Sequence, residues 1–242
     1  MEIRGKTALV TGGAKRVGRT IALELAKKGA HILLHYHRSE KEARQAADEI
    51  KTLGVSCGLL QADLSVAKDV STMAAEALKL RKSVDILVNS ASLFFKTPPE
   101  TASEADWDKL MDTNLKAPFL LSTEIGRRMV KQGGSIVNIA DWSGFRPYKD
   151  YSAYCSSKGG LITLTKALAR DLAPRVRVNA VAPGPVLAPP DMSETEKEAV
   201  AKTTALGRWR KPEDIAYAVN FLIENDFVNG IVLVVDGGRS LV

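Results

Sequence analysis

The 242-residue chain has few cysteines and no long apolar run. Its two cysteines, Cys57 and Cys155, are too few for a disulfide framework and lack metal-ligand spacing, so we expect reduced thiols and no metal. No apolar run reaches the ~18 residues that span a bilayer, and the first run, TALV, stops at TGG instead of forming a signal peptide. These absences predict a soluble, cytoplasmic protein without a membrane segment.

The composition also lacks any extreme, and the chain shows no internal repeat. Hydrophobic residues make up 45% and charged residues 26%, which is ordinary for a globular protein. The net charge of +6 favours an anionic partner, either nucleic acid or a phosphorylated cofactor. The most basic stretch, RWRK at 208–211, runs into KPED, which is typical of a helix start. We therefore expect no nucleic-acid binding.

Apolar runs typical of buried strands alternate with helical patterns from end to end. Seven runs are typical of strands, at 6–12, 31–37, 56–64, 85–91, 134–141, 175–184 and 230–238. Six segments have helical spacing, at 17–30, 40–53, 65–80, 104–131, 152–172 and 212–223. Pro118 is expected to bend the fourth helix. The alternation predicts one α/β domain over residues 1–242, a Rossmann-type doubly wound parallel sheet of about seven strands with helices on both faces.

Two proline-containing stretches interrupt the alternation, at 93–103 and 182–200, and the second includes Pro189 and Pro190. Both follow strand ends, which is where open α/β sheets bind ligands. Loops of this length in a compact domain are often functional. We expect a substrate loop over about 186–204.

The stretch TGGAKRVG, at 11–18, lies between the first strand and the first helix. Gly12 and Gly18 allow a tight turn and a close approach of a phosphate, and the following helix directs free N–H groups at an anion. Lys15 and Arg16 add positive charge to the turn. The pattern indicates a dinucleotide-binding turn in preference to an ordinary strand-to-helix connection.

No acidic residue occupies positions 34–39, although a site for an unphosphorylated dinucleotide typically has Asp or Glu after the second strand. The chain instead has His37, Arg38 and Ser39, whose charge and hydroxyl suit a 2′-phosphate, unless they only cap the next helix. The cofactor is therefore predicted to be NADPH/NADP+. Asp63, which ends the third strand, could bind the adenine amino group or cap the following helix.

Tyr154 and Lys158 are four residues apart in YSAYCSSKGG and would share one face of a helix. A phenol normally has a pKa of ~10, and a nearby ammonium lowers it because it stabilises the phenolate. The spacing therefore indicates a tunable proton donor.

Taken together, these motifs resemble the short-chain dehydrogenase/reductase family over nearly the whole chain. The matching segments are TGGAKRVG, NSAS at 89–92, DTNLKAPF, YCSSK at 154–158, RVRVNAVAPG and VDGG. The resemblance implies that Tyr154 is the acid/base residue, that Lys158 binds the nicotinamide ribose, and that Asn114 holds a water or a backbone link in a proton relay. It also implies a homotetramer and further cofactor contacts at Val17, Leu64, Asn89, Ala91, Ser92, Pro183 and Gly184.

One position departs from the family pattern. The usual catalytic serine, about thirteen residues before the tyrosine, corresponds to Asp141. An ionised carboxylate cannot donate a hydrogen bond to a carbonyl, but it can accept from an amino-bearing heterocycle, or pass a proton if burial raises its pKa. Ser143 is the competing candidate, because residues two apart in a strand face the same side. An aspartate here, together with GAKRVG and HYHRS, is similar to the pteridine reductase subgroup.

That similarity implies reduction of dihydropterins, or of dihydrofolate, with NADPH and with a proton from Tyr154 or Asp141. The pterin would contact Tyr154 and Asp141 and also Arg16, Ser92 and Phe94, and Phe94 would stack on its ring. Phe94 as a core aromatic and Ser92 as a turn hydroxyl are the structural alternatives. Reduction of 3-oxoacyl thioesters or other ketones, with Ser143 replacing Asp141, is the alternative activity, and a non-enzymatic cofactor sensor is the third hypothesis.

Overall fold

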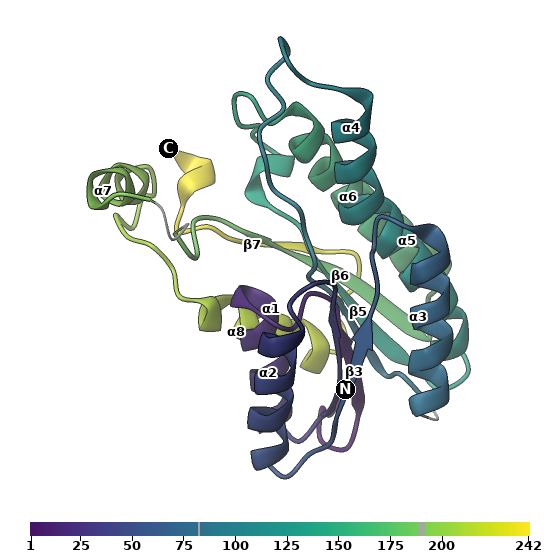
Figure 1. Ribbon diagram of the computed structural model, residues 1–242. Coiled ribbons are helices and arrows are strands. Elements are labelled where there is room, and N and C mark those ends of the chain that lie inside the picture. The colour runs from purple at the N-terminus through teal and green to yellow at the C-terminus, as the bar shows by residue number, and fades with distance from the viewer. Residues whose placement is uncertain (82, 189–191) are drawn as a thin grey trace.

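The computed structural model describes residues 1–81, 83–188 and 192–242. Within these ranges the strands form one parallel sheet in the order β3-β2-β1-β4-β5-β6-β7 (Figure 1). Their bounds are β1 Thr7–Val10, β2 His31–Tyr36, β3 Cys57–Gln61, β4 Ile86–Asn89, β5 Gly134–Ile139, β6 Val176–Pro183 and β7 Val232–Val235. The predicted Rossmann-type sheet of seven strands is confirmed.

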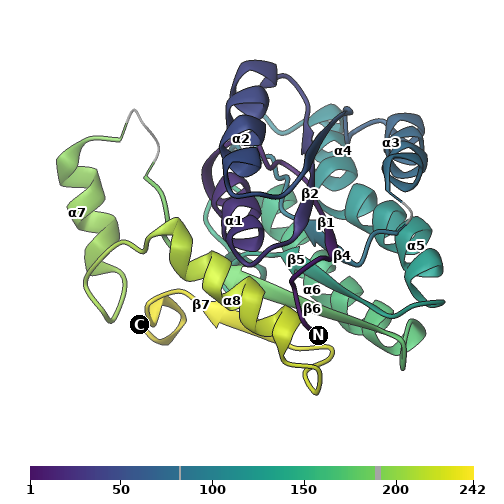
Figure 2. The same ribbon diagram turned by 90° about the horizontal axis from the view of Figure 1, so that it is seen from below.

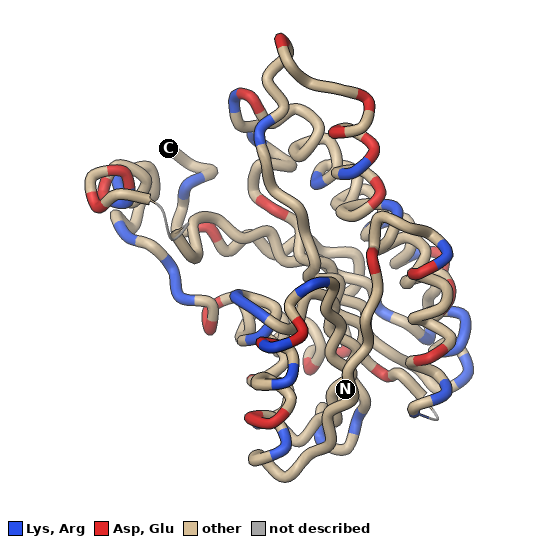
Figure 3. The backbone as a smooth tube through the Cα atoms, in the orientation of Figure 1, with Lys and Arg blue, Asp and Glu red and all other residues tan. Residues whose placement is uncertain are grey.

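Helices cover both faces of this sheet (Figure 2). Their bounds are α1 Arg16–Lys27, α2 Glu40–Thr52, α3 Ala67–Leu80, α4 Glu104–Met111, α5 Ala117–Met129, α6 Ser152–Asp171, α7 Glu194–Lys202 and α8 Pro212–Glu224. One hydrophobic cluster joins α1, α2 and α8 to one face, and a second joins α3, α5 and α6 to the other. Charged residues occur mainly on the helices and loops around the sheet (Figure 3).

Strand β1 shows why these runs are apolar at every position. Ala8 and Val10 belong to the first cluster, whereas Leu9 between them belongs to the second. Successive strand residues point to opposite faces, and both faces here are covered by helices. A strand buried on both faces therefore needs consecutive apolar residues.

The chain changes direction across the sheet at β1, which pairs with β2 on one side and with β4 on the other. The connections that leave the carboxyl ends of β1 and β4 run to opposite sides and leave a crevice between them. This crevice, at the point where the strand order reverses, is called the switch point of the sheet, and it is where a ligand site can form.

The segment expected to form one helix, 104–131, is divided into α4 and α5 by a π-helical turn at Asp112–Lys116. Pro118 lies in the first turn of α5. A proline lacks the N–H group and its ring collides with the carbonyl four residues earlier, and a wider π-helical turn relieves both problems. The expected distortion therefore lies before the proline and takes the form of a π-helical turn.

The expected substrate loop at about 186–204 is also not wholly irregular, because it contains α7. Ser193 and Glu196 form a reciprocal capping box at the start of this helix. Residues 189–191 of the loop, including Pro189 and Pro190, lie outside the described residues. In the described parts of the chain, no helix has both the length and the apolar character needed to cross a membrane.

Candidate active site

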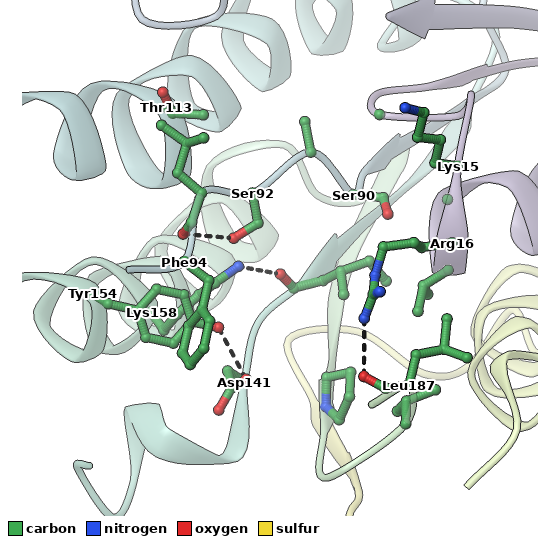
Figure 4. A pocket seen from close by; sticks show the side chains of 18 of the residues that line it. Lys15, Arg16, Ser90, Ser92, Phe94, Thr113, Asp141, Tyr154, Lys158 and Leu187 are labelled. Carbon is green, nitrogen blue, oxygen red and sulfur yellow. Dashed lines mark hydrogen bonds between the residues drawn. The ribbon is translucent and has the colours of Figure 1, made fainter. Parts of the chain in front are cut away.

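A cavity of about 950 Å³ lies at the carboxyl ends of the strands, at the switch point (Figure 4). The strand-to-helix turn after β1 contributes Lys15 and Arg16 from one side. Asp141, which follows β5, and Tyr154 of α6 face it from the other side. The cavity therefore joins the predicted phosphate turn to the predicted catalytic residues.

The glycine turn fits closely against its surroundings. Gly12 has a φ of +65°, and a Cβ there would lie 2.9 Å from the Cα of Ala91. A Cβ on Gly18 would lie 2.3 Å from the carbonyl oxygen of Gly12. Only glycine fits at these two positions, and the first turn of α1 has no acidic residue. The turn therefore exposes backbone N–H groups to an anion without a competing carboxylate.

Lys15 and Arg16 both line the cavity, but each also has a partner within the protein. The Nζ of Lys15 lies 2.7 Å from Oε1 of Glu42 in α2. Arg16 has a φ of +52° and donates from Nη2 to the carbonyl oxygen of Leu187, 2.9 Å away. Arg16 thus joins the glycine turn to the segment after β6.

His37, Arg38 and Ser39 line the same end of the cavity. Ser39 is the N-cap residue of α2, but its hydroxyl makes no capping hydrogen bond, so simple helix capping does not account for it. Asp63 accepts from the N–H and the hydroxyl of Ser65, and its Oδ2 lies 3.5 Å from Nε2 of His37. Asp63 therefore orders the turn before α3 and also faces the cavity.

Three ionisable side chains meet at the other end (Figure 4). The hydroxyl of Tyr154 donates to Oδ2 of Asp141 over 2.9 Å. The Nζ of Lys158 donates to the carbonyl oxygen of Ile139 over 2.9 Å and lies 5.7 Å from the centre of the Tyr154 ring. The predicted spacing on one helix therefore puts both residues against the carboxylate that follows β5.

The electrostatics differ from the sequence-based expectation. Burial raises the pKa of Tyr154 well above its usual value of 10, and the negative charge of Asp141 raises it further. Burial lowers the pKa of Lys158 from 10.5 to about 8, although Asp141 acts in the opposite direction. The expectation that Lys158 lowers the pKa of Tyr154 is therefore not met, because burial and the hydrogen-bonded carboxylate both favour the neutral phenol.

Two asparagines lie behind the cavity and do not line it. Asn114, on the π-helical turn, accepts from the N–H of Leu93 over 2.8 Å and donates to the hydroxyl of Ser157 over 3.2 Å. This is a backbone link of the kind expected. Asn89 is buried and donates hydrogen bonds to Ser122 and Asn138. Its side chain therefore stabilises neighbouring elements, and the expected contact with the cofactor cavity is absent.

Phe94 lies at the mouth of the cavity with 54% of its surface exposed, so the alternative of a core aromatic is wrong. Its ring stacks on Tyr151 with centroids 4.6 Å apart and meets Tyr154 edge-on at 4.8 Å. The hydroxyl of Ser92 points to Asn114 and to the carbonyl of Leu93. Ser143 is fully buried, does not line the cavity and has no partner for its hydroxyl, because a short 3-10 helix replaces the expected strand there.

The remaining predicted cofactor contacts, at Val17, Leu64, Ala91, Pro183 and Gly184, line the cavity. Several further lining residues were not expected from the sequence, among them His35, Tyr148, Tyr151, Trp209 and Arg239. His35 lies in HYHRS, directly after the apolar residues of the second strand. A histidine inside such an apolar run is the sequence signal that could have indicated a polar role for this residue. The other four come from segments whose proximity depends on the tertiary fold.

Comparison with known proteins agrees with this geometry. The model of the family described as short chain dehydrogenase matches residues 6–199. The chain is 35% identical to the 3-oxoacyl-(acyl-carrier-protein) reductase FabG of Staphylococcus aureus, over 98% of each chain. It is also 35% identical to dehydrogenase/reductase SDR family member 4 of Homo sapiens, over 98% of this chain and 88% of that protein.

Two solved structures share the fold closely. A blue fluorescent protein from a metagenomic library, in complex with NADPH, is 31% identical with a TM-score of 0.93 and covers 99% of this chain and 100% of that one. A dehydrogenase/reductase from Sinorhizobium meliloti is 35% identical with a TM-score of 0.91 over 98% and 97% of the two chains. These relatives do not show the pteridine reductase subgroup, but the chain belongs to the short-chain dehydrogenase family.

Proposed function

We propose that this protein is an NADPH-dependent reductase. The close-fitting glycine turn, the free hydroxyl of Ser39, and Arg38 and His37 at the end of β2 suit the phosphates of this cofactor. When bound, NADPH would supply a hydride to the substrate. Lys158, Pro183 and Gly184 would hold the nicotinamide end, and Lys15 and Arg16 the phosphate end.

We further propose that the substrate is a flat heterocycle with an amino edge, of the pterin class. The hydrogen bond between Asp141 and Tyr154 carries this proposal, because it puts a carboxylate where a ketone reductase needs a donor. Asp141 would accept hydrogen bonds from the amino edge of the ring, and the Tyr154 hydroxyl would give a proton to the ring nitrogen. Phe94, exposed beside Tyr154, offers a face on which the ring can stack.

Reduction of a 3-oxoacyl thioester is the second candidate, and the FabG relatives support it more directly than they support the first. In that case Tyr154 alone would donate to the substrate carbonyl. Ser143 could not substitute for the missing serine, since its hydroxyl is buried away from the cavity. The two candidates therefore differ in what they require of Asp141.

The test measures NADPH oxidation with dihydrobiopterin, dihydrofolate and acetoacetyl-coenzyme A, in the parent and in the Asp141→Ser and Ser143→Ala variants. The pterin proposal expects turnover of a dihydropterin that falls about 10²-fold or more in Asp141→Ser. Ser143→Ala is the matched control and should keep parental activity. Turnover of the thioester alone, retained or increased in Asp141→Ser, would replace the first candidate with the second.

A further inference from the structure

The C-terminal segment brings an arginine into the substrate end of the cavity. We propose that Arg239 is a specificity residue that binds an anionic group, a carboxylate or a phosphate, which the substrate carries outside the part that is reduced. Arg239 lines the cavity but follows the last strand, far in sequence from the catalytic residues. The inference rests on the proposed reductase function, and it extends that function by naming a second feature of the substrate.

The backbone around Arg239 is held firmly in place. Asp236, directly after β7, accepts from the N–H of Gly238 over 2.8 Å and from the N–H of Ser240 over 2.7 Å. A Cβ on Gly184 would lie 2.6 Å from the Cα of Asp236, so this turn lies against the end of β6. Arg146 donates to the carbonyl oxygens of Ser240 and Val242. The segment is therefore anchored on both sides of Arg239.

The side chain is also oriented. Its guanidinium carbon lies 4.7 Å from the centre of the Trp142 ring and 5.6 Å from that of Tyr148. The indole N–H of Trp142 donates to the hydroxyl of Tyr148, which ties the two rings together. Stacking on aromatic faces uses the flat surface of a guanidinium and leaves its N–H edge available. That edge matches the two oxygens of a carboxylate or phosphate.

Two opposite charges lie at this end of the cavity, the carboxylate of Asp141 and the guanidinium of Arg239. Trp142 immediately follows Asp141, so the rings that hold Arg239 belong to the segment that also carries the carboxylate. Asp141 accepts hydrogen bonds from Tyr154 and from the N–H of Ser143, one at each oxygen, and each oxygen keeps a further lone pair for a ligand. In the parts of the chain that the structure describes, no carboxylate forms a salt bridge with Arg239. The cavity thus offers an acceptor for an amino edge and, separately, a cation for an acidic tail.

Aromatic side chains provide the surface between these two groups. Tyr148 and Tyr151 line the cavity, and Phe94 lies against both, at 6.3 Å from Tyr148 and 4.6 Å from Tyr151. A substrate with a flat ring and an acidic tail could therefore contact aromatic surface along its length. Among pterins, this favours a compound with a carboxylate-bearing tail over one with an uncharged side chain.

The test compares KM for dihydrofolate, whose tail carries carboxylates, with KM for dihydrobiopterin, whose side chain is uncharged. Arg239→Met should raise KM for dihydrofolate about 10- to 100-fold, change KM for dihydrobiopterin less than about twofold, and leave kcat unchanged. Arg239→Lys should give an intermediate KM, since it keeps the charge but not the forked donor geometry. Arg128→Met, which removes an exposed arginine in the last turn of α5, is the control.

A second experiment measures ligand affinity in place of turnover, so that failure of this inference can be distinguished from failure of the proposed function. With NADPH present, the affinity of methotrexate is compared with that of 2,4-diamino-6-methylpteridine, which lacks the acidic tail, in the parent and in both Arg239 variants. If thioesters alone turn over, acetoacetyl-coenzyme A and acetoacetyl-N-acetylcysteamine replace this pair. Loss confined to the anionic member of a pair supports the inference. Equal losses for both members, or no loss for either, would overturn it, whatever the reaction proves to be.

Discussion

At the scale of single residues, burial and one carboxylate together determine the electrostatics of the site. Burial raises the pKa of Tyr154 and lowers that of Lys158, and Asp141, which accepts from the Tyr154 hydroxyl, raises the pKa of both. A neutral Tyr154 has its proton available to give over the whole physiological range. This protonation state is the one that a proton donor needs.

The first prediction concerns Tyr154. Tyr154→Phe removes the hydroxyl but keeps the ring that Phe94 contacts. We expect kcat to fall about 10²- to 10⁴-fold, because general acid catalysis is lost, with little change in NADPH affinity. Steady-state kinetics and fluorescence titration with NADPH measure the two quantities. A variant with parental turnover would contradict the role of Tyr154 as the proton donor, and a parent protein that binds NADPH but turns over no substrate would favour the non-enzymatic cofactor sensor.

The second prediction concerns pH and Lys158. Burial lowers the pKa of Lys158 to about 8, so its charge is present below that pH and is lost above it. NADPH affinity should therefore decrease as the pH rises through about 8, because an ammonium near the bound nucleotide is neutralised. Asp141→Asn removes the group that raises this pKa, so the decrease should begin at a lower pH. Titrations between pH 6 and 10 test this, and an unchanged or higher midpoint in Asp141→Asn would contradict it.

At the scale of elements, the glycine turn depends on the neighbouring strand. Nδ1 of His35, in β2, accepts from the N–H of Gly12 over 3.0 Å, and its other ring nitrogen, Nε2, lies 3.2 Å from the carbonyl oxygen of Ala62. Burial lowers the pKa of His35 to about 4, so the ring is neutral at pH 7 and can accept this hydrogen bond. A strand side chain therefore fixes the shape of the phosphate turn.

The third prediction follows from this arrangement. Burial lowers the pKa of His35 from its ordinary value of 6.5 to about 4 in the folded protein, so its contribution to stability is complete above pH 6.5 and is lost as the pH falls towards 4. The loss is on the order of 3 kcal/mol in the free energy of unfolding. His35→Gln should make this acid-induced loss smaller and should weaken NADPH binding at pH 7.

Urea unfolding at pH 7, 5.5 and 4.5 measures the first effect, and NADPH titration measures the second. His31→Gln is the matched control, since it removes an imidazole at the opposite end of β2, away from the residues that line the cavity. Equal acid sensitivity in the parent and in His35→Gln would refute the role assigned to His35.

At the scale of the whole molecule, the sheet has an unpaired edge at β7, beside α8. Large apolar side chains are exposed along α8, the segment that leads into β7 and β7 itself: Tyr217, Phe221, Phe227, Ile231 and Val234. Phe227 is 99% exposed and Tyr217 is 58% exposed. Apolar groups concentrated beside an open sheet edge are typical of a surface that another chain covers.

The fourth prediction is therefore that this face, at the last strand, is one interface of the expected homotetramer, whose other interface is formed by the long helices. Sedimentation at micromolar concentration should give about four times the chain mass of 26.2 kDa. Phe221→Glu should reduce that mass, whereas Leu53→Glu, at the end of α2, should not. A parent protein that sediments as a monomer would contradict the prediction.

Local sequence pattern was sufficient to predict the seven strands, the glycine turn and the Tyr154–Lys158 pair. Strand periodicity, helix spacing and turn glycines are each recognised within a few neighbouring residues. Local pattern also marks the start of α7, where Ser193 and Glu196 form a capping box, but it does not predict the π-helical turn before Pro118. Nor could it predict that Asn89 faces the interior, since a strand residue buried on either face has the same local pattern.

By itself, then, the sequence determined the fold class, the glycine turn between β1 and α1 and the spacing of Tyr154 and Lys158 on one helix, because each is marked by a pattern of residues close together in the chain. Only the tertiary structure decided how Asp141 bonds to Tyr154, why Ser143 is excluded from the cavity, and that Arg239 reaches it from the last turn of the chain. The physical reason is distance in sequence. The pKa of a buried group and the shape of a cavity depend on side chains that the parallel crossovers bring together from distant parts of the chain. Neither property can be predicted from a local sequence pattern.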